Sequence, residues 1–426
     1  MSLAAQLSCL SDYDPNSFSV DHARRFILEQ LEPIAASERV ALRSALGRVL
    51  AEDVIAPCNV PAHDNSAMDG YAVRHADLSP DAPSRLKVRG VALAGKSFAG
   101  SIGPGECVRI MTGAVPPAGT DTVVIQEVVA TEGELGEIVV VPPGQRLGQH
   151  IRLAGEDLAG GKPALAAGRL VRPAELGLIA SLGFAEISVR RRLRVAFFST
   201  GDELCSIGSP LREGEVYDSN RYTLFGMLAR MGCDVLDLGV VGDDPAALEA
   251  AFRRAAESAD VVLTSGGVSV GDADFVKQLM QQLGEVLFWK IAMKPGRPMA
   301  FGRIREGSRA AWLFGLPGNP VAVMTTFYQF VRDALYTLMG ADPVPRVPLL
   351  PAVCTAPIRK APGRTEFQRG ILAAEDGRWT VRPTGAQGSG ILRSMSDANC
   401  FIVLGPEQSG VAAGETVSVQ LFDGLV

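Results

Sequence analysis

Apolar residues change their spacing several times along the chain. Near the N-terminus they recur three and four positions apart, which is typical of amphipathic helices. Ser19 is a suitable N-cap for such a run over residues 19–31, and Ser37 for another over residues 37–50. Residues 173–183, PAELGLIASLG with the preceding cap region, show the same helical character. We therefore expect three helices in these segments.

Between residues 51 and 148 the apolar residues instead fall into short runs such as LKVRGVAL, ECVRIM and EIVVV. Clusters of Gly and Pro separate these runs, which is the pattern of strands joined by turns. This region is predicted to be a small β-rich domain. The proline-rich stretch PVPRVPLLP opens a similar pattern, so we expect a C-terminal β domain over residues 342–426.

From Leu193 onward, short apolar strands alternate with amphipathic helices. The strands LRVAFFS, DVLDLGVV and DVVLTS are each followed by a helical run, which predicts a doubly wound parallel sheet with helices on both faces. This α/β domain is expected over residues 190–341. The whole chain is thus predicted to be multi-domain, α/β plus β, with a linking helical segment formed by residues 11–50 and 149–185.

Composition narrows the classes of function. The 426 residues are enough for several domains, and a net charge of −6 argues against a nucleic-acid binder. No apolar run approaches the ~18 residues of a membrane span, and the N-terminus does not resemble a signal peptide. The seven cysteines are scattered without a C-x-x-C pair. Reduced thiols in a cytoplasmic protein are therefore expected, without disulfides or a zinc site.

The stretch TSGGVSVGDADFVK, Thr264–Lys277, is the first candidate for chemistry. It contains G-x-S-x-G around Ser269, but a serine hydrolase of that type has its histidine after the serine, and no histidine follows His150. It is not a phosphate-binding Walker loop either, because Asp272 follows Gly271 where a lysine is needed. The sequence therefore argues against both a serine hydrolase and a Walker-type nucleotide-binding protein.

The same loop fits a different kind of anion cradle. A glycine-rich turn between strand and helix exposes backbone N–H groups, and Thr264, Ser265 and Ser269 add hydroxyl donors. Asp272 and Asp274 would repel a bare phosphate, so Mg²⁺ is a natural complement. On this segment alone the alternative stays open that Asp272 only caps the helix and the glycines only form a turn.

Three further loops follow other strands of the predicted sheet, and parallel strands present such loops at one edge. STGDEL carries Glu203, which is placed to hold a metal together with Asp274. MKPGRP carries two cations, Lys294 and Arg297, suited to an oxyanion, with Lys290 nearby. GLPGNP, residues 315–320, opens the last helix. Any one of these loops alone could be a helix cap or a solvated basic turn.

Together the four loops resemble the molybdopterin molybdenumtransferase family, which includes the C-terminal domain of gephyrin. PAHDNSAMDGYA, MTGA and RLAGED, residues 61–72, 111–114 and 152–157, match further motifs of that family. The resemblance spans nearly the whole chain. It implies insertion of molybdate into adenylated molybdopterin, with Mg²⁺-dependent hydrolysis of the adenylate and release of AMP, in the last step of molybdenum cofactor synthesis.

The resemblance also implies roles for particular residues. Glu203 and Asp274 would bind Mg²⁺. The DNSAMDG loop would reach the cleft of the partner subunit in an elongated homodimer, and an association with the molybdopterin adenylyltransferase is also expected. The catalytic residues implied are Asp64, Thr112, Asp157, Glu203, Asp243, Asp274, Lys290 and Lys294. The substrate- and anion-binding residues implied are Ser265, Gly266, Gly267, Ser269, Lys294, Arg297, Pro317, Pro320, Arg369 and Ser389.

This sequence departs from the family pattern at three positions. Arg297 stands where relatives often have lysine, Ala322 where many have serine, and Asp272 where glutamate is common. No residue separates molybdate from tungstate. Two other functions stay open: the adenylyltransferase of the preceding step, which resembles the α/β domain alone, and a non-enzymatic scaffold. The additional N-terminal and C-terminal domains argue against the first, and the intact charged residues against the second.

Overall fold

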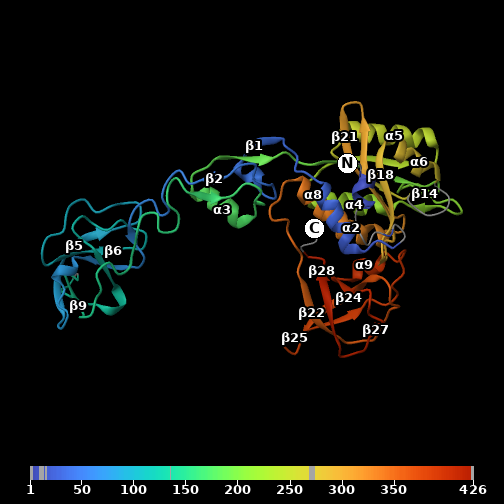
Figure 1. Ribbon diagram of the computed structural model, residues 1–426. Coiled ribbons are helices and arrows are strands. Elements are labelled where there is room, and N and C mark those ends of the chain that lie inside the picture. The colour runs from blue at the N-terminus through green and yellow to red at the C-terminus, as the bar shows by residue number, and fades with distance from the viewer. Residues whose placement is uncertain (1–2, 9–13, 15–16, 135, 268–273, 424–426) are drawn as a thin grey trace. The chain divides into compact units, whose positions relative to one another are not determined.

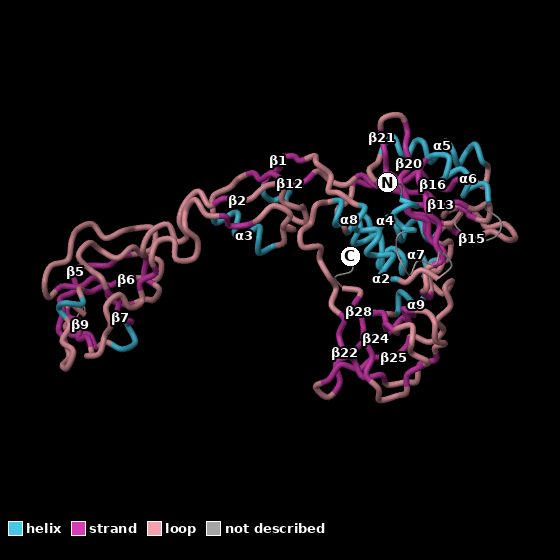
Figure 2. Tube along the Cα trace, in the orientation of Figure 1, coloured by secondary structure: helices cyan, strands magenta, loops and turns pink. Residues whose placement is uncertain are grey.

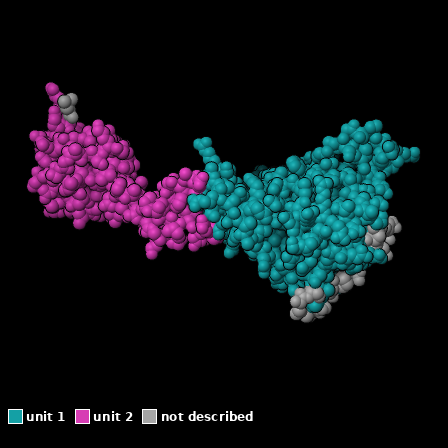
Figure 3. Space-filling view, turned by 90° about the horizontal axis from the view of Figure 1, so that it is seen from above, with its two compact units in different colours: residues 1–51, 168–172, 187–426 teal, residues 52–167, 173–186 magenta. Residues whose placement is uncertain are grey.

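The computed structural model describes residues 3–8, 14, 17–134, 136–267 and 274–423. The chain forms two compact units, shown in different colours in Figure 3. Unit 1 comprises Met1–Ala51, Gly168–Arg172 and Ile187–Val426, and unit 2 comprises Glu52–Ala167 and Pro173–Glu186. The described part of the chain contains no helix with the length and apolar character needed to cross a membrane.

The centre of unit 1 is a six-stranded sheet. Its order is β16 (Asp234–Val241), β13 (Arg194–Thr200), β17 (Val261–Ser265), β21 (Arg309–Leu316), β20 (Pro298–Glu306) and β18 (Gly284–Lys290). The first four strands are parallel, and β20 runs antiparallel to both of its neighbours. Only residues 307 and 308 join β20 to β21, and so short a connection permits only an antiparallel hairpin. The predicted doubly wound α/β domain is thus confirmed, with one reversed strand.

Side chains of β13 are buried on both faces of this sheet. Val195 and Phe197 pack in one hydrophobic cluster with α4 (Ser219–Arg230) and α2 (Val20–Gln30). Ala196 and Phe198 pack in a second cluster with α5 (Pro245–Ser258) and α6 (Asp274–Leu283), which Figure 1 shows close together beside the sheet. Burial on both faces explains why these strands are continuously apolar rather than alternating.

The last helical run of the α/β domain is continuous but not uniform. It consists of α7 (Pro320–Thr326), a π-helical turn (Phe327–Val331) and α8 (Arg332–Leu338). The short N-terminal helix α1 (Leu3–Ser8) contacts β18. A small pair of parallel strands, β14 (Leu204–Cys205) and β15 (Val216–Tyr217), follows β13.

The C-terminal part of unit 1 is a β domain, seen in Figure 2 as a separate group of magenta strands. Strand β24 pairs with both β25 and β26, so five strands close into a small barrel. These strands are β22 (Leu349–Cys354), β24 (Thr365–Glu375), β25 (Arg378–Pro383), β26 (Cys400–Leu404) and β28 (Thr416–Leu421), accompanied by α9 (Arg393–Asp397), β23 (Ile358–Arg359) and β27 (Gly410–Val411). From the α/β domain, β19 (Met293–Lys294) joins the sheet by pairing with β24.

Unit 2 is β-rich, as the alternating pattern predicts. Its six-stranded sheet has the order β7 (Thr122–Ile125), β4 (Gly70–Val73), β6 (Glu106–Ile110), β5 (Ser84–Ala92), β9 (Ile138–Val141) and β8 (Ala130–Glu132). Two short pairs accompany it: β3 (Asn65–Ser66) with β10 (Ile151–Arg152), and β2 (Val54–Ile55) with β11 (Pro163–Leu165). The unit also contains α3 (Pro173–Ser181) and two short 3-10 turns (His75–Asp77 and Gln126–Val128).

Two of the three helices predicted near the ends of the linking segment are confirmed, as α2 and α3. Ser19 caps α2 as expected, its Oγ accepting from the His22 N–H at 3.2 Å. The helix predicted over residues 37–50 is wrong. This stretch forms β1 (Ser37–Ala41), paired with β12 (Glu186–Arg190), and a 3-10 turn (Leu42–Ala45). Gly47 then adopts φ +74°, which ends any helical run.

Candidate functional site

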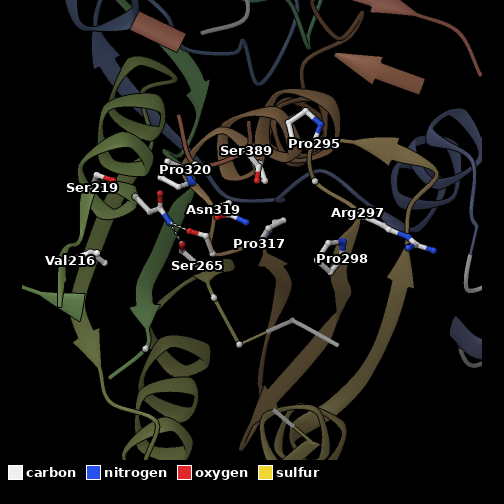
Figure 4. A pocket seen from close by; sticks show the side chains of 18 of the residues that line it. Val216, Ser219, Ser265, Pro295, Arg297, Pro298, Pro317, Asn319, Pro320 and Ser389 are labelled. Carbon is white, nitrogen blue, oxygen red and sulfur yellow. Dashed lines mark hydrogen bonds between the residues drawn. The ribbon is translucent and has the colours of Figure 1, made fainter. Parts of the chain in front are cut away.

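A cavity of about 1020 Å³ lies at the carboxyl ends of the parallel strands of unit 1. Thr200 ends β13, Ser265 ends β17 and Pro317 follows β21, and all three line it. Open α/β sheets bind ligands at this edge. The predicted site residues that line the cavity are Glu203, Asp243, Ser265, Gly266, Gly267, Lys294, Arg297, Pro317, Pro320 and Ser389, several of which are drawn in Figure 4.

The glycine-rich loop is shaped by close backbone contacts. Gly266 has φ +95°, and a Cβ there would lie 2.5 Å from the Thr200 carbonyl oxygen. Its N–H donates to the Leu316 carbonyl at 3.1 Å. The start of the loop is thus held between the ends of β13 and β21, and only glycine fits. Gly266 and Gly267 also line the cavity.

Asn220 links three segments around the cavity and was not among the predicted site residues. Its Nδ2 donates to Ser265 Oγ at 2.8 Å and to the Gly318 carbonyl at 2.6 Å. It therefore ties the first turn of α4 to the end of β17 and to the GLPGNP loop (Figure 4). By itself, the sequence DSN before a helix indicates only a helix cap. Asp218 does cap α4, accepting from the Arg221 N–H at 3.1 Å, but both residues also line the cavity.

The carboxylates beside β13 are held by the strand ends. Asp243 Oδ1 accepts from Thr200 Oγ1 at 3.0 Å, and its N–H donates to Asp202 Oδ1 at 3.0 Å. Glu203 folds back over the preceding glycine, since a Cβ at Gly201 would lie 2.5 Å from Glu203 Oε2. These contacts place two carboxylates, Asp243 and Glu203, on the cavity lining.

Three cations line the cavity at its border with the C-terminal barrel. Lys294 Nζ lies 3.4 Å from Glu366 Oε1, and the Glu366 side chain is only 7% exposed against 52% for Lys294. Gln368 Nε2 also donates to Glu366, at 2.8 Å. Arg297 is exposed at the same loop, and Arg364, which precedes β24, is a cation that the sequence did not single out. Lys290 ends β18 opposite Pro298 and is not part of the described lining.

Ser389 and Arg369 occupy different positions. Ser389 lines the cavity, and its carbonyl accepts from the Val321 N–H at 3.0 Å. Arg369 is 1% exposed and lies under the same loop, donating from Nε to Ser394 Oγ and from NH2 to the Gly388 carbonyl, both at 2.9 Å. Burial lowers the pKa of its guanidinium to about 10, so it stays charged at neutral pH. Arg369 therefore supports the loop instead of lining the cavity.

Three predicted motifs come together in unit 2. Strand β3 of DNSAMDG pairs with β10 at the start of RLAGED, and the Asp64 carboxylate accepts from the Ala154 N–H at 2.7 Å. Asp69 Oδ1 accepts from both the N–H and Oγ1 of Thr112, each at 2.7 Å, and these bonds lower the pKa of Asp69. The Asp157 N–H donates to the Val60 carbonyl at 3.1 Å. We call these loops, residues 60–69, 111–114 and 150–157, the motif cluster.

Part of the glycine loop lies outside the described residues. Ser269 and Asp272 fall there, as does the side chain of Asp274, at which α6 begins. The predicted Glu203–Asp274 metal pair therefore stays a prediction. Among the residues that the structure describes, no group of three or more His, Cys, Asp or Glu side chains is arranged to hold a metal ion.

Comparison with known proteins agrees with this division of the fold. The MoeA N-terminal region (domain I and II) matches residues 18–183, a probable molybdopterin binding domain matches residues 196–337, and the MoeA C-terminal region (domain IV) matches residues 351–422. The chain is 45% identical to the molybdopterin molybdenumtransferase of Haemophilus influenzae, over 96% of this chain and 99% of the relative. It is 38% identical to molybdopterin molybdenumtransferase 2 of Mycobacterium tuberculosis, over 94% and 98%.

A solved structure shows the same architecture. The crystal structure of the molybdopterin biosynthesis MoeA protein from Pyrococcus horikoshii aligns with a TM-score of 0.81 and 28% identity, over 95% of this chain and all of that one (100%). The chain belongs to the molybdopterin molybdenumtransferase (MoeA) family and is an enzyme of molybdenum cofactor biosynthesis. The resemblance stated from the sequence motifs is thereby confirmed.

Proposed function

We propose that this enzyme inserts molybdate into adenylated molybdopterin, with Mg²⁺-dependent hydrolysis of the adenylate and release of AMP. The observation that carries the proposal is the cavity at the sheet edge, whose lining carboxylates follow β13 and β16 and whose cations Lys294 and Arg297 lie between β18 and β20, at the other end of the strand order. Phosphate and oxyanion groups of a substrate need the cations, and a metal cation bound to the phosphates needs the carboxylates. This reaction would be the last step of molybdenum cofactor synthesis.

The cationic side would bind molybdate and the phosphate groups. Lys294 is a point charge, whereas the guanidinium groups of Arg297 and Arg364 form planar, two-pronged hydrogen bonds to oxyanions. Glu366 orients Lys294 because its buried carboxylate contacts Nζ. The Gly267 N–H would be a further donor toward an anion, whereas the Gly266 N–H already donates to the Leu316 carbonyl. Lys290 would act through the fold of this region, since its backbone joins β18 to β20.

The carboxylates of the cavity supply oxygen ligands, which are the ligands that Mg²⁺ prefers. Glu203 lines the cavity, and Mg²⁺ is usually held by one or two carboxylates together with substrate phosphates and water, so a cluster of three protein ligands is not required. Glu203 and Asp274 would hold the ion. When bound, it would neutralise charge on the adenylate phosphates and polarise the phosphorus–oxygen bond that is broken.

Other residues would keep this arrangement rigid. Asn220 fixes the spacing of the glycine loop and the GLPGNP loop, and Thr200 fixes Asp243. Arg369 holds the loop that carries Ser389. Reacting groups held in place before binding lower the cost of reaching the transition state. The predicted roles of Pro317 and Pro320 are of this kind, because both shape the lining loop.

The proposal includes a cytoplasmic homodimer in which the motif cluster completes the cavity of the partner subunit. Asp64, Thr112 and Asp157 would then act across the subunit interface, and the adenylyltransferase of the preceding step would supply the substrate. Mixed dimers of Asp64→Ala and Glu203→Ala chains test this. One of the two sites in such a dimer would combine an intact cavity with an intact cluster, so activity should return. No recovery on mixing two inactive variants would contradict an intermolecular site.

The reaction is tested with the purified chain, adenylated molybdopterin, Mg²⁺ and molybdate. We expect AMP release that depends on molybdate and is lost in Asp274→Ala. AMP release without any dependence on molybdate, or an Asp274→Ala chain as active as the unmodified enzyme, would contradict the proposal. Adenylation of molybdopterin at the expense of ATP would instead assign the preceding step to this chain.

A further inference from the structure

Two residues that line the cavity each carry a buried oxygen atom with no hydrogen-bond partner among the residues that the structure describes. These atoms are Asp218 Oδ2 and Asn220 Oδ1. Asp218 is only 3% exposed and Asn220 only 7%. Buried polar atoms in folded proteins nearly always have a partner, so an unpartnered pair beside a cavity marks a place where a ligand supplies it.

The chemistry of this pair is restricted to accepting hydrogen bonds. The other carboxylate oxygen of Asp218 already accepts from the Arg221 N–H. Both amide hydrogens of Asn220 are used, toward Ser265 Oγ and the Gly318 carbonyl. The amide cannot be turned over, because its oxygen would then face the Gly318 carbonyl, which only accepts. This part of the lining therefore offers acceptors and no donor from either side chain.

The cations of the cavity lie elsewhere on its lining. In Figure 4, Ser219 and Ser265 lie on the side opposite Arg297. Ser219 follows Asp218 in the sequence, and Ser265 Oγ accepts from Asn220 Nδ2. A ligand that spans the cavity would thus have its anionic groups toward Lys294 and Arg297. Its other end would need N–H groups to meet Asp218 and Asn220.

We propose that Asp218 and Asn220 bind the N–H and amino edge of the substrate's pterin ring. The inference rests on the proposed function, in which the substrate contains two heterocycles, a pterin and an adenine. A pterin has a ring N–H next to an exocyclic amino group, so that edge only donates. Adenine has its amino group next to ring nitrogens that accept, and these would face another acceptor. The pair therefore selects the pterin and leaves the adenylate to the cationic side.

Asp218→Asn is the sharpest variant. Asparagine keeps an oxygen to cap α4 but replaces the free oxygen by an amide that donates. The matched control is Asp244→Asn, because Asp244 caps α5 in the same way, accepting from the Ala247 N–H at 2.8 Å, and does not line the cavity. Equilibrium binding of adenylated molybdopterin and of AMP is measured on the full chain of each variant, together with circular dichroism and a melting curve.

We expect Asp218→Asn to weaken binding of adenylated molybdopterin by about tenfold or more, because a donor then faces a donor. AMP binding should stay within twofold, and Asp244→Asn should change neither. A change below twofold for adenylated molybdopterin, or an equal loss for AMP, would overturn the inference. The proposed function would survive that result if molybdate-dependent AMP release by the unmodified enzyme were intact.

A pair of competing ligands gives a second readout that does not depend on a variant. Pterin and lumazine have the same ring system, but lumazine has an oxygen in place of the 2-amino group. Pterin should displace adenylated molybdopterin at about tenfold lower concentration than lumazine, since a site built for a donor rejects an analogue without it. Equal displacement by pterin and by lumazine would count against the inference. So would an Asp218→Asn chain whose Mg²⁺ dependence changes while its preference for pterin over lumazine stays the same.

Discussion

The cavity of unit 1 and the motif cluster of unit 2 use their carboxylates and amides in opposite ways. In the cluster, Asp64 is exposed and Asp69 is partly buried, and both carboxylates accept from backbone N–H groups of neighbouring loops, with the Thr112 hydroxyl as a further donor to Asp69. In the cavity, Asp218 and Asn220 are buried, yet each keeps an oxygen without a partner in the described structure. Bonds in the cluster fix the shape of loops, whereas the two unmatched oxygen atoms of the cavity residues are those for which we propose a ligand partner. Substitutions in the two regions should therefore have different effects.

The largest effect is expected from Lys294→Met. It removes a cation from the cavity and leaves the Glu366 carboxylate buried without its charge partner. Loss of one preorganised electrostatic contact commonly reduces turnover about 100-fold. Rates of molybdate-dependent AMP release measure this, with Lys162→Met, an exposed position in unit 2, as control. A Lys294→Met rate within twofold of the unmodified enzyme would remove Lys294 from the anion site.

Asn220→Ala should lower both activity and stability. Two buried hydrogen bonds are lost and their partners are left without a donor, which should cost about 1–3 kcal/mol of unfolding free energy. Activity should fall about tenfold because the two loops are no longer held together. Urea unfolding and AMP release measure the two effects. The control is Asn59→Ala, whose Oδ1 accepts from the Gly160 N–H in unit 2 and which should leave activity unchanged.

Ala322→Ser should have a smaller effect, in the opposite direction. Ala322 is 3% exposed and lines the cavity, so a serine there would add one hydroxyl donor to the lining. We expect the KM for molybdate to fall a few-fold, which corresponds to a net gain of about 1 kcal/mol from one hydrogen bond. Kinetics at varied molybdate concentration test this. A KM that rises would mean that the hydroxyl turns toward the protein.

The smallest effect is expected from Asp69→Asn in the motif cluster. Asp69 is only partly buried, so the melting temperature should change by no more than about 2 °C. The Thr112 amide should nevertheless exchange faster with solvent, because a neutral amide oxygen is a weaker acceptor than a carboxylate. Hydrogen exchange of that amide gives the measurement. An unchanged exchange rate would show that the carboxylate contributes nothing to this link.

The same link gives a pH dependence with a definite sign. The bonds from Thr112 lower the pKa of Asp69 below its ordinary value of 3.8, which means that the folded loop favours the carboxylate. The stabilisation is fully present above pH 3.8 and is lost as the pH falls through the lowered pKa. Protection of the Thr112 amide should therefore persist to about that pH and then decrease. Loss of protection already at pH 6 would contradict this.

The sequence predicted those cavity residues that lie in loops directly after strands. Gly266 and Gly267, Glu203, and Pro317 with Pro320 are found on the cavity lining because they follow strand ends, and strand ends can be recognised locally. Asn220 was missed because its partners are 45 and 98 positions away, whereas its local context, DSN before a helix, indicates only a cap.

Two other differences have physical causes of the same kind. Apolar residues spaced three and four apart predicted a helix over residues 37–50, but Leu50 bridges to Val189 and the backbone pairs with β12 instead. Tertiary pairing there overrides a local preference. Arg369 was predicted to bind the substrate, yet it is buried and donates hydrogen bonds to Ser394 Oγ and to the carbonyl of Gly388 in the loop that carries Ser389. A residue type and a motif do not reveal which side of a loop a side chain occupies.

If Lys294 binds the anion as proposed, the pairing of β19 with β24 makes the C-terminal barrel part of the catalytic apparatus. Lys294 lies opposite Glu366 in that pairing, so the strand that begins the anion loop is also an edge of the barrel sheet. Residue changes inside the barrel, at Phe367 for example, would alter the charge field around the substrate without touching it. A shortened enzyme that ends after the α/β domain would keep its glycine loop and lose the fixed position of its main cation. Under the proposed function, affinity for oxyanions would thus be a property that the two domains share.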